Sequence, residues 1–111
     1  MTEDITAMER RRFARVTVRD LNSERRVSMS VRVRDISLSG VLMLASRPLE
    51  EGQYGHLSTR FGAQPLEADI EVRRVSTTRD DRGAYRIAAR FVGLDEAARR
   101  TMRQFLRNGS I

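Results

Sequence analysis

The sequence predicts a mainly β fold, a small six-stranded antiparallel β-barrel followed by one C-terminal α-helix. Short segments of alternating apolar and polar residues are separated by turn residues at regular spacing, which is typical of small barrels. Near residue 95 the apolar period changes from two to about 3.6, the helical period. The 111 residues suffice for one domain. We expect a flexible leader over residues 1–9, the domain over residues 10–107 and a short tail over residues 108–111.

The first three strands are predicted from the N-terminal half of the chain. Residues 13–19 alternate between apolar and polar, and residues 27–34 alternate again after a polar break suited to a turn. Residues 40–45 are apolar at nearly every position. Because such runs are typical of strands buried on both faces, we expect this segment to be a central strand covered on both sides.

The next three strands follow with the same period. Residues 56–61 and 66–72 alternate and are joined by a Gly- and Pro-containing hairpin. The phase then slips at Arg73 and Arg74, as at a β-bulge. After a charged loop, residues 85–91 alternate and form the last strand.

The C-terminal segment has the signals of an amphipathic helix. Asp95 is suited to the N-cap, Glu96 follows in the first turn, and arginines occupy the later turns, which matches the helix dipole. An apolar stripe is expected to close one open end of the barrel, and it consists of Leu94, Ala98, Met102, Phe105 and Leu106.

The alternation of the second strand fails at Asp35, which occupies the phase of the inward valines. Asp35 is therefore either a buried acid that needs partners or the place where the strand leaves register. With Ser37 and Gly40 it forms an Asp-x-Ser-x-x-Gly segment, which occurs once in the chain. The segment can close an Asx-type turn. It can also bind a ligand, because a carboxylate accepts from guanine N1–H and N2–H, and glycine permits close approach or a positive φ.

An arginine cluster leads into the first strand. Arg11 and Arg15 are four residues apart, and Arg10 adds a further guanidinium. Guanidinium groups match phosphate oxygens and the O6/N7 edge of guanine, and their flat faces stack on bases. The same arginine spacing recurs elsewhere in this arginine-rich chain, so the spacing alone predicts nothing. It is informative here because the Asp-x-Ser-x-x-Gly segment follows it downstream.

An RxxxR segment followed by DxSxxG resembles the PilZ domain, the bacterial receptor module for cyclic di-GMP, and the resemblance covers nearly the whole chain. It implies a barrel of the split-barrel type that binds cyclic di-GMP, changes conformation and signals to an unknown downstream protein. Arg10 would also favour a self-stacked ligand dimer. The chain departs from the family at Ala88, where glycine is common. The ligand-binding residues that the resemblance implies are Arg10, Arg11, Arg15, Asp35, Ser37 and Gly40.

Composition limits the other classes of function. The net charge is +6, and all 21 basic residues are arginine, which predicts attraction to anionic partners. The chain has no cysteine, which excludes disulfides, thiolate metal sites and cysteine catalysis and fits the cytoplasm. Its N-terminus lacks the apolar core of a signal peptide, and no segment approaches the ~20 apolar residues of a membrane span.

No enzyme, catalytic residue, metal or cofactor is expected. His56 stands in an alternating strand without a second histidine, so we interpret it as a solvated or edge-strand residue. Glu67, Asp69 and Glu71 alternate along one strand and are interpreted as a solvated sheet face with no perturbed acid.

Two alternatives to a nucleotide receptor stay open. The first is a basic barrel that binds nucleic acid, which is disfavoured because most aromatic residues are expected in the core and no stacking platform is left. The second is a degenerate PilZ-like adaptor that acts through protein contacts alone, which Ala88 favours mildly. The protein is expected to be a monomer or a homodimer.

Overall fold

The computed structural model describes residues 13–19, 25–61, 63–80 and 82–107. Arg10, Arg11, the expected leader and the expected tail lie outside these ranges. The elements within them are β1 (Phe13–Arg19), β2 (Arg26–Ile36), β3 (Gly40–Ala45), β4 (Tyr54–Phe61), β5 (Gln64–Val75), β6 (Tyr85–Val92) and α2 (Glu96–Arg107).

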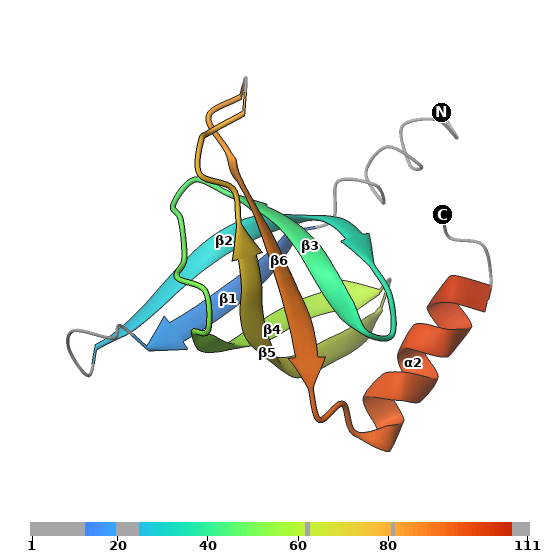
Figure 1. The fold of residues 1–111 in the computed structure, drawn as a ribbon. Coiled ribbons are helices and arrows are strands. Elements are labelled where there is room, and N and C mark those ends of the chain that lie inside the picture. Colours follow the sequence, from blue (N-terminus) through green and yellow to red (C-terminus); the bar gives the residue numbers. More distant parts are fainter. Residues whose placement is uncertain (1–12, 20–24, 62, 81, 108–111) are drawn as a thin grey trace.

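The six described strands close into a barrel in the order β1-β2-β3-β6-β5-β4 (Figure 1). All neighbouring pairs are antiparallel, and β1 pairs with β4 to complete the ring. Each of these strands therefore has a hydrogen-bonded neighbour on both sides. The predicted fold class, a six-stranded antiparallel barrel with a C-terminal helix, is confirmed.

The core fills the barrel with the residues that the alternation places inward. Each large apolar side chain buried in this way contributes about 1.5–3 kcal/mol relative to exposure. The largest side chains with almost no exposed surface are Met43, Leu57, Leu66, Ile70, Ile87, Met102, Val16, Val31 and Val72.

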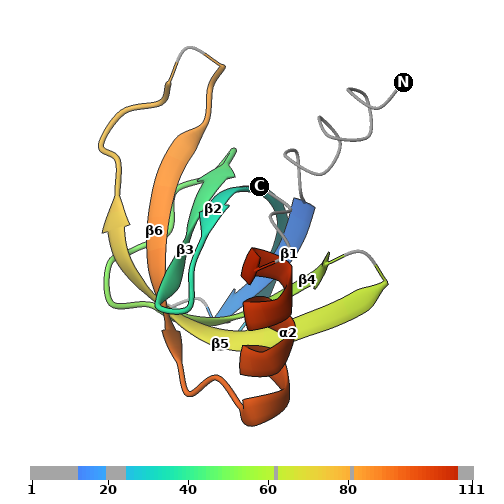
Figure 2. The ribbon, with the colours of Figure 1, turned by 90° about the vertical axis from the view of Figure 1, so that its right-hand side faces the viewer.

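Helix α2 begins where the sequence predicts. The Asp95 carboxylate accepts a hydrogen bond from the Ala98 amide over 2.7 Å, which confirms Asp95 as the N-cap. Ala98 and Met102 are buried in the same apolar cluster as the barrel residues, and Phe105 packs partly against it. Figure 2 shows α2 lying against the barrel, alongside β5. Within the described residues, no helix has the length and apolar character needed to cross a membrane.

Strand β3 is covered less completely than expected. Its inward residues Val41, Met43 and Ala45 are buried, but Leu42 and Leu44 on the outer face are only half-buried. Among the described elements, the prediction of a strand covered on both sides was wrong, because α2 packs mainly beside β5 and the outer residues Leu42 and Leu44 stay partly exposed.

Two β-bulges bend the barrel strands. The β5 register shifts between Val72 and Arg74, where the sequence phase slips. The β2 register shifts between Val33 and Asp35, and Asp35 is exposed. The interpretation of Asp35 as the place where the strand leaves register is therefore confirmed, and the buried-acid alternative was wrong.

Candidate functional site

The candidate site begins with the turn between β2 and β3, which Ser37 holds together. The Ser37 amide donates to the Gly40 carbonyl over 2.9 Å. The Ser37 hydroxyl oxygen accepts from the amides of Ser39 at 3.2 Å and of Gly40 at 3.4 Å. The turn-closing role expected of Ser37 is thus confirmed. The Ser37 and Ser39 hydroxyls also share a hydrogen bond of 2.9 Å, so the Ser37 hydroxyl is engaged within the turn as both acceptor and partner.

Asp35 stands on the exposed side of the same turn. One carboxylate oxygen accepts from the Ile36 amide over 2.9 Å. In the described part of the chain, no cation pairs with this carboxylate. An exposed carboxylate with one uncommitted oxygen can accept hydrogen bonds from a ligand.

Gly40 is required by close packing, not by backbone conformation. Among the described glycines, positive φ occurs at Gly52, Gly83 and Gly93 and not at Gly40. A Cβ atom on Gly40 would lie 2.3 Å from the carbonyl oxygen of Ala89 on β6. The positive-φ role predicted for Gly40 was wrong, the backbone that approaches it closely is that of β6, and its close approach to a ligand stays a prediction.

Arg15 lies on β1 at a distance from this turn. It is exposed and stands opposite Ser30 of β2, five positions before Asp35, or about 16 Å at ~3.3 Å per residue. Its Nη1 donates to the Ser28 hydroxyl over 3.4 Å, in the direction opposite to Asp35. The structure thus brings Asp35, Ser37 and Gly40 together, but it does not bring Arg15 to them.

The cation beside the turn is Arg90, which stands opposite Gly40 on β6. Its Nε donates to Glu71 of β5, and Arg73 Nη1 lies 3.6 Å from the same carboxylate oxygen. The hydrogen bond from Arg90 holds the pKa of Glu71 below its ordinary range. Sequence alternation places Arg90 and Glu71 outside the barrel, but it carries no signal that they face each other across strands.

A second polar cluster lies on the outer face of β4 and β5. His56 Nε2 is 2.7 Å from a Glu67 oxygen, and Nδ1 is 3.0 Å from an Asp69 oxygen. Ser58 also donates to Glu67. Hydrogen bonds that His56 donates to Asp69 and then to Glu67 raise the pKa of His56, and hydrogen bonds that Glu67 accepts from Ser58 and then from His56 lower the pKa of Glu67.

The sequence interpretations of this cluster hold in part. His56 is solvated, with 45% of its side chain exposed, but it is not on an edge, because β4 pairs with both β1 and β5. Glu67 and Asp69 lie on a solvated face as expected, but both contact His56, and the expectation of no perturbed acid was wrong because the pKa of Glu67 is lowered. Within the described residues, no group of three or more His, Asp or Glu side chains is arranged to hold a metal ion.

The raised pKa of His56 predicts a pH-dependent stability. Because the pKa of His56 is higher in the folded state than the ordinary value of 6.5, the protonated imidazole stabilises the fold. This stabilisation is fully present below pH 6.5 and is lost as pH rises through the folded-state pKa. Because the cluster is exposed, we expect His56→Gln to cost less than about 1 kcal/mol near pH 6 and nothing near pH 9. Thermal unfolding at the two pH values measures this, and an equal loss at both would contradict it. The chain holds one histidine, so no other imidazole interferes.

Comparison with known proteins adds a family and a fold. The PilZ domain model matches residues 9–108. Among solved structures, MrkH of K. pneumonia in its apo state is similar with a TM-score of 0.64 and 18% sequence identity. The alignment covers 86% of this chain and 45% of MrkH, so the chain spans less than half of that protein. The similarity shows the fold.

No curated protein sequence matches the chain significantly. The family model nevertheless extends over almost the whole chain and includes both the arginine cluster and the β2–β3 turn. On that match, the protein belongs to the PilZ domain family.

Proposed function

We propose that this protein is a cyclic di-GMP receptor that changes conformation on binding and signals to a partner protein. The observation that carries the proposal is the β2–β3 turn, where Asp35 and Ser37 stand exposed and Asp35 keeps one carboxylate oxygen uncommitted for a ligand. Family membership supports the same assignment. The proposed ligand-binding residues are Arg10, Arg11, Arg15, Asp35, Ser37 and Gly40.

The turn has the chemistry to recognise guanine. The uncommitted oxygen of Asp35 accepts from N1–H and N2–H, the donor edge that distinguishes guanine from adenine. The exposed Ser37 hydroxyl donates to a ligand acceptor by exchanging its hydrogen bond with the Ser39 hydroxyl. Gly40 contributes indirectly, because its missing side chain lets β3 pack on β6 and fixes the turn.

The arginines reach the ligand from the chain that precedes β1. The β1–β2 pairing begins with Phe13 opposite Arg32, three residues before Asp35, so β1 starts at the end of β2 that carries the turn. A ligand held at the turn therefore lies near Phe13, the first described residue of β1, which Arg10 and Arg11 closely precede in the sequence. The Arg15 guanidinium exchanges its bond to Ser28 for a ligand phosphate.

Binding then becomes a signal by ordering the arginine segment against the barrel. A charged segment that folds onto a ligand changes the surface presented to other proteins. Two guanines and two phosphates let one ligand bridge the turn and the arginines, which a mononucleotide does less well. GTP is therefore a discriminating control.

The test is a calorimetric titration with cyclic di-GMP, with GTP and a short single-stranded oligonucleotide as controls. We expect saturable binding that Asp35→Asn weakens about tenfold or more, because a charge-assisted hydrogen bond is lost. Asp69→Asn makes the same chemical change on another exposed strand position and should bind normally. Two ligands per chain would support the stacked dimer proposed from Arg10. No heat and no thermal shift at high ligand concentration would contradict the proposal.

The adaptor alternative has one observation in its favour, the orientation of Arg15 toward Ser28 and away from the turn. An adaptor without ligand would give no heat in the same titration, and a protein partner would then be sought.

The nucleic-acid alternative fits the described surface poorly. Its exposed aromatic residues are Phe13 and Tyr54, with 64% and 59% of their surface exposed. They lie near opposite ends of the β1–β4 pair, so they cannot stack successive bases of one strand. Strong, salt-sensitive binding of the control oligonucleotide would favour this alternative.

A further inference from the structure

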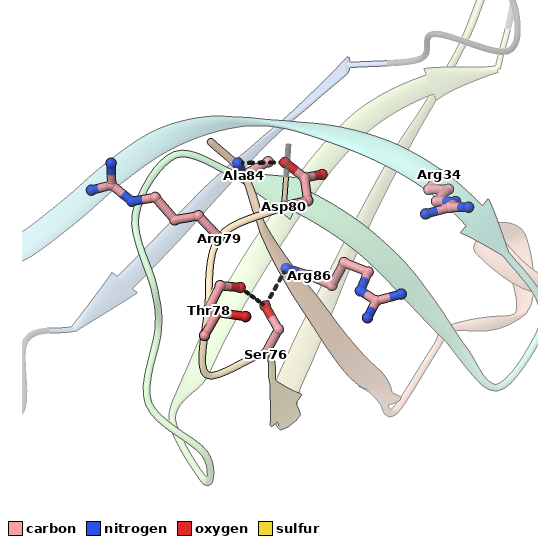
Figure 3. A pocket seen from close by; sticks show the side chains of 7 residues that line it. All are labelled: Arg34, Ser76, Thr78, Arg79, Asp80, Ala84 and Arg86. Carbon is pink, nitrogen blue, oxygen red and sulfur yellow. Dashed lines mark hydrogen bonds between the residues drawn. The ribbon is translucent and has the colours of Figure 1, made fainter. Parts of the chain in front are cut away.

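A small pocket lies beside the loop between β5 and β6, next to β2 (Figure 3). Its volume is about 140 Å³, well below the ~300–1,000 Å³ of pockets that enclose whole drug-sized ligands. The described residues that line it are Arg34, Ser76, Thr78, Arg79, Asp80, Ala84 and Arg86.

Asp80 is committed to the structure of the loop. Its Oδ1 accepts from the Arg82 and Ala84 amides, both at 2.9 Å. Its own amide donates to the Ala84 carbonyl over 2.8 Å. Backbone hydrogen bonds, first that of Ala84, hold the pKa of Asp80 below its ordinary value. The one described acid of the pocket wall thus maintains the loop that forms the wall.

Two further side chains of the wall, those of Ser76 and Arg79, are also engaged. The Ser76 hydroxyl accepts from the Arg86 amide at 2.9 Å and donates to the Thr78 carbonyl at 3.1 Å. Arg79 donates through Nε to the Tyr85 hydroxyl at 3.3 Å, and its guanidinium lies 5.5 Å from the Tyr85 ring centroid. In Figure 3 the Arg79 side chain points away from Arg34 and Arg86.

Two guanidinium groups are left over, those of Arg34 and Arg86. Within the described residues, neither has a hydrogen-bonded or ion-paired acceptor for its guanidinium. Figure 3 shows the Arg86 side chain extending from β6 toward the side of β2 where Arg34 stands. Two like charges at one pocket favour an anion between them, and the planar forks match tetrahedral oxyanions in a bidentate manner.

We infer that Arg34 and Arg86 form a binding pocket for one phosphate group of a small molecule, either free or esterified. The pocket volume suits a single phosphate group with some water and excludes a whole dinucleotide. This site is distinct from the six residues proposed above and does not depend on the proposed function. Arg34 directly precedes Asp35, however, so a phosphodiester of a ligand held at the β2–β3 turn is one source of the phosphate.

The test is an NMR titration of the full chain with inorganic phosphate, against chloride at matched ionic strength. We expect saturable shifts of the Arg34 and Arg86 side-chain N–H signals and of the Ala84 amide. Arg86→Gln and Arg34→Gln should each weaken phosphate binding about tenfold or more. Arg82→Gln removes the same charge from the loop outside the pocket wall and should change binding less than about twofold.

Two results would overturn the pocket. One is the absence of any shift specific to phosphate, and the other is an equal weakening by Arg82→Gln, which would show general charge attraction.

Cyclic di-GMP titrated into the same variants separates the two possible sources of the phosphate group. If Arg86→Gln weakens the dinucleotide, the phosphate is its phosphodiester; if only inorganic phosphate is lost, the pocket serves a separate phosphate compound. If phosphate binds but cyclic di-GMP does not, the inferred phosphate pocket is supported and only the proposed receptor function is contradicted.

Discussion

Arg15→Ala is expected to weaken cyclic di-GMP binding by about 2–4 kcal/mol, or ~30- to 700-fold in Kd. Two charge-assisted hydrogen bonds to a phosphate in a partly desolvated site account for this magnitude. The fold should be unaffected, because Arg15 is exposed and its side chain makes one long hydrogen bond, to Ser28. Calorimetry measures the change in affinity, and the thermal unfolding midpoint checks the fold.

Arg19→Ala is the matched control for this prediction. Arg19 lies four residues further along β1 on the same outer face and is also exposed. Its replacement removes the same charge and should change affinity by less than about threefold. Normal binding by Arg15→Ala would remove Arg15 from the site. Equal losses in both variants would point to the overall positive charge instead.

Gly40→Ala is expected to lower the free energy of unfolding by about 2–3 kcal/mol. The added methyl group would meet the Ala89 carbonyl oxygen at 2.3 Å and the Arg90 Cα at 3.2 Å. Both obstacles are backbone atoms of β6, so relief requires moving the β3–β6 pairing and not one flexible side chain. Urea unfolding measures the change.

Ser39→Ala is the control for Gly40→Ala. It alters the neighbouring exposed residue, whose side chain contacts only the Ser37 hydroxyl among the described residues, and should cost less than about 1 kcal/mol. Unchanged stability of Gly40→Ala would mean that β3 and β6 separate easily at this point. If Gly40→Ala is destabilised as expected, any loss of ligand affinity in this variant results from the altered fold. The test of the ligand-binding site then depends on the Asp35 and arginine variants.

The periodicity of the sequence predicted the strands, the inward residues and the Asp95 cap, because these follow from local geometry. A side chain alternates across a strand whatever its neighbours are, and a cap needs only a carboxylate three residues before an amide. The bulge near Arg74 was also predicted, since a bulge shifts the alternation within its own strand. The Asp-x-Ser-x-x-Gly turn is likewise continuous in the chain.

The remaining features depend on which strands meet, and alternation does not encode that. His56 and Asp69 face each other because β4 and β5 pair in one register, and Arg90 faces Glu71 because β5 and β6 do. Arg34 and Arg86 come from β2 and β6, which are separated by β3. The requirement for glycine at position 40 could not be predicted either, because it comes from the carbonyl group of Ala89, 49 positions away in the chain.

Closure of the barrel restricts how a partner protein can attach. Many signalling domains capture peptides by β-augmentation, in which an extended segment adds to a sheet and bonds its main chain. Each described strand has a neighbour on both sides, so no strand presents a whole free edge; the unpaired stretches are short, such as residues 26–31 of β2 on the side of β3. Over the rest of the barrel, a partner must recognise side chains on the outer face, in the loops or on α2. Its specificity will change with single surface substitutions, which a main-chain contact would tolerate.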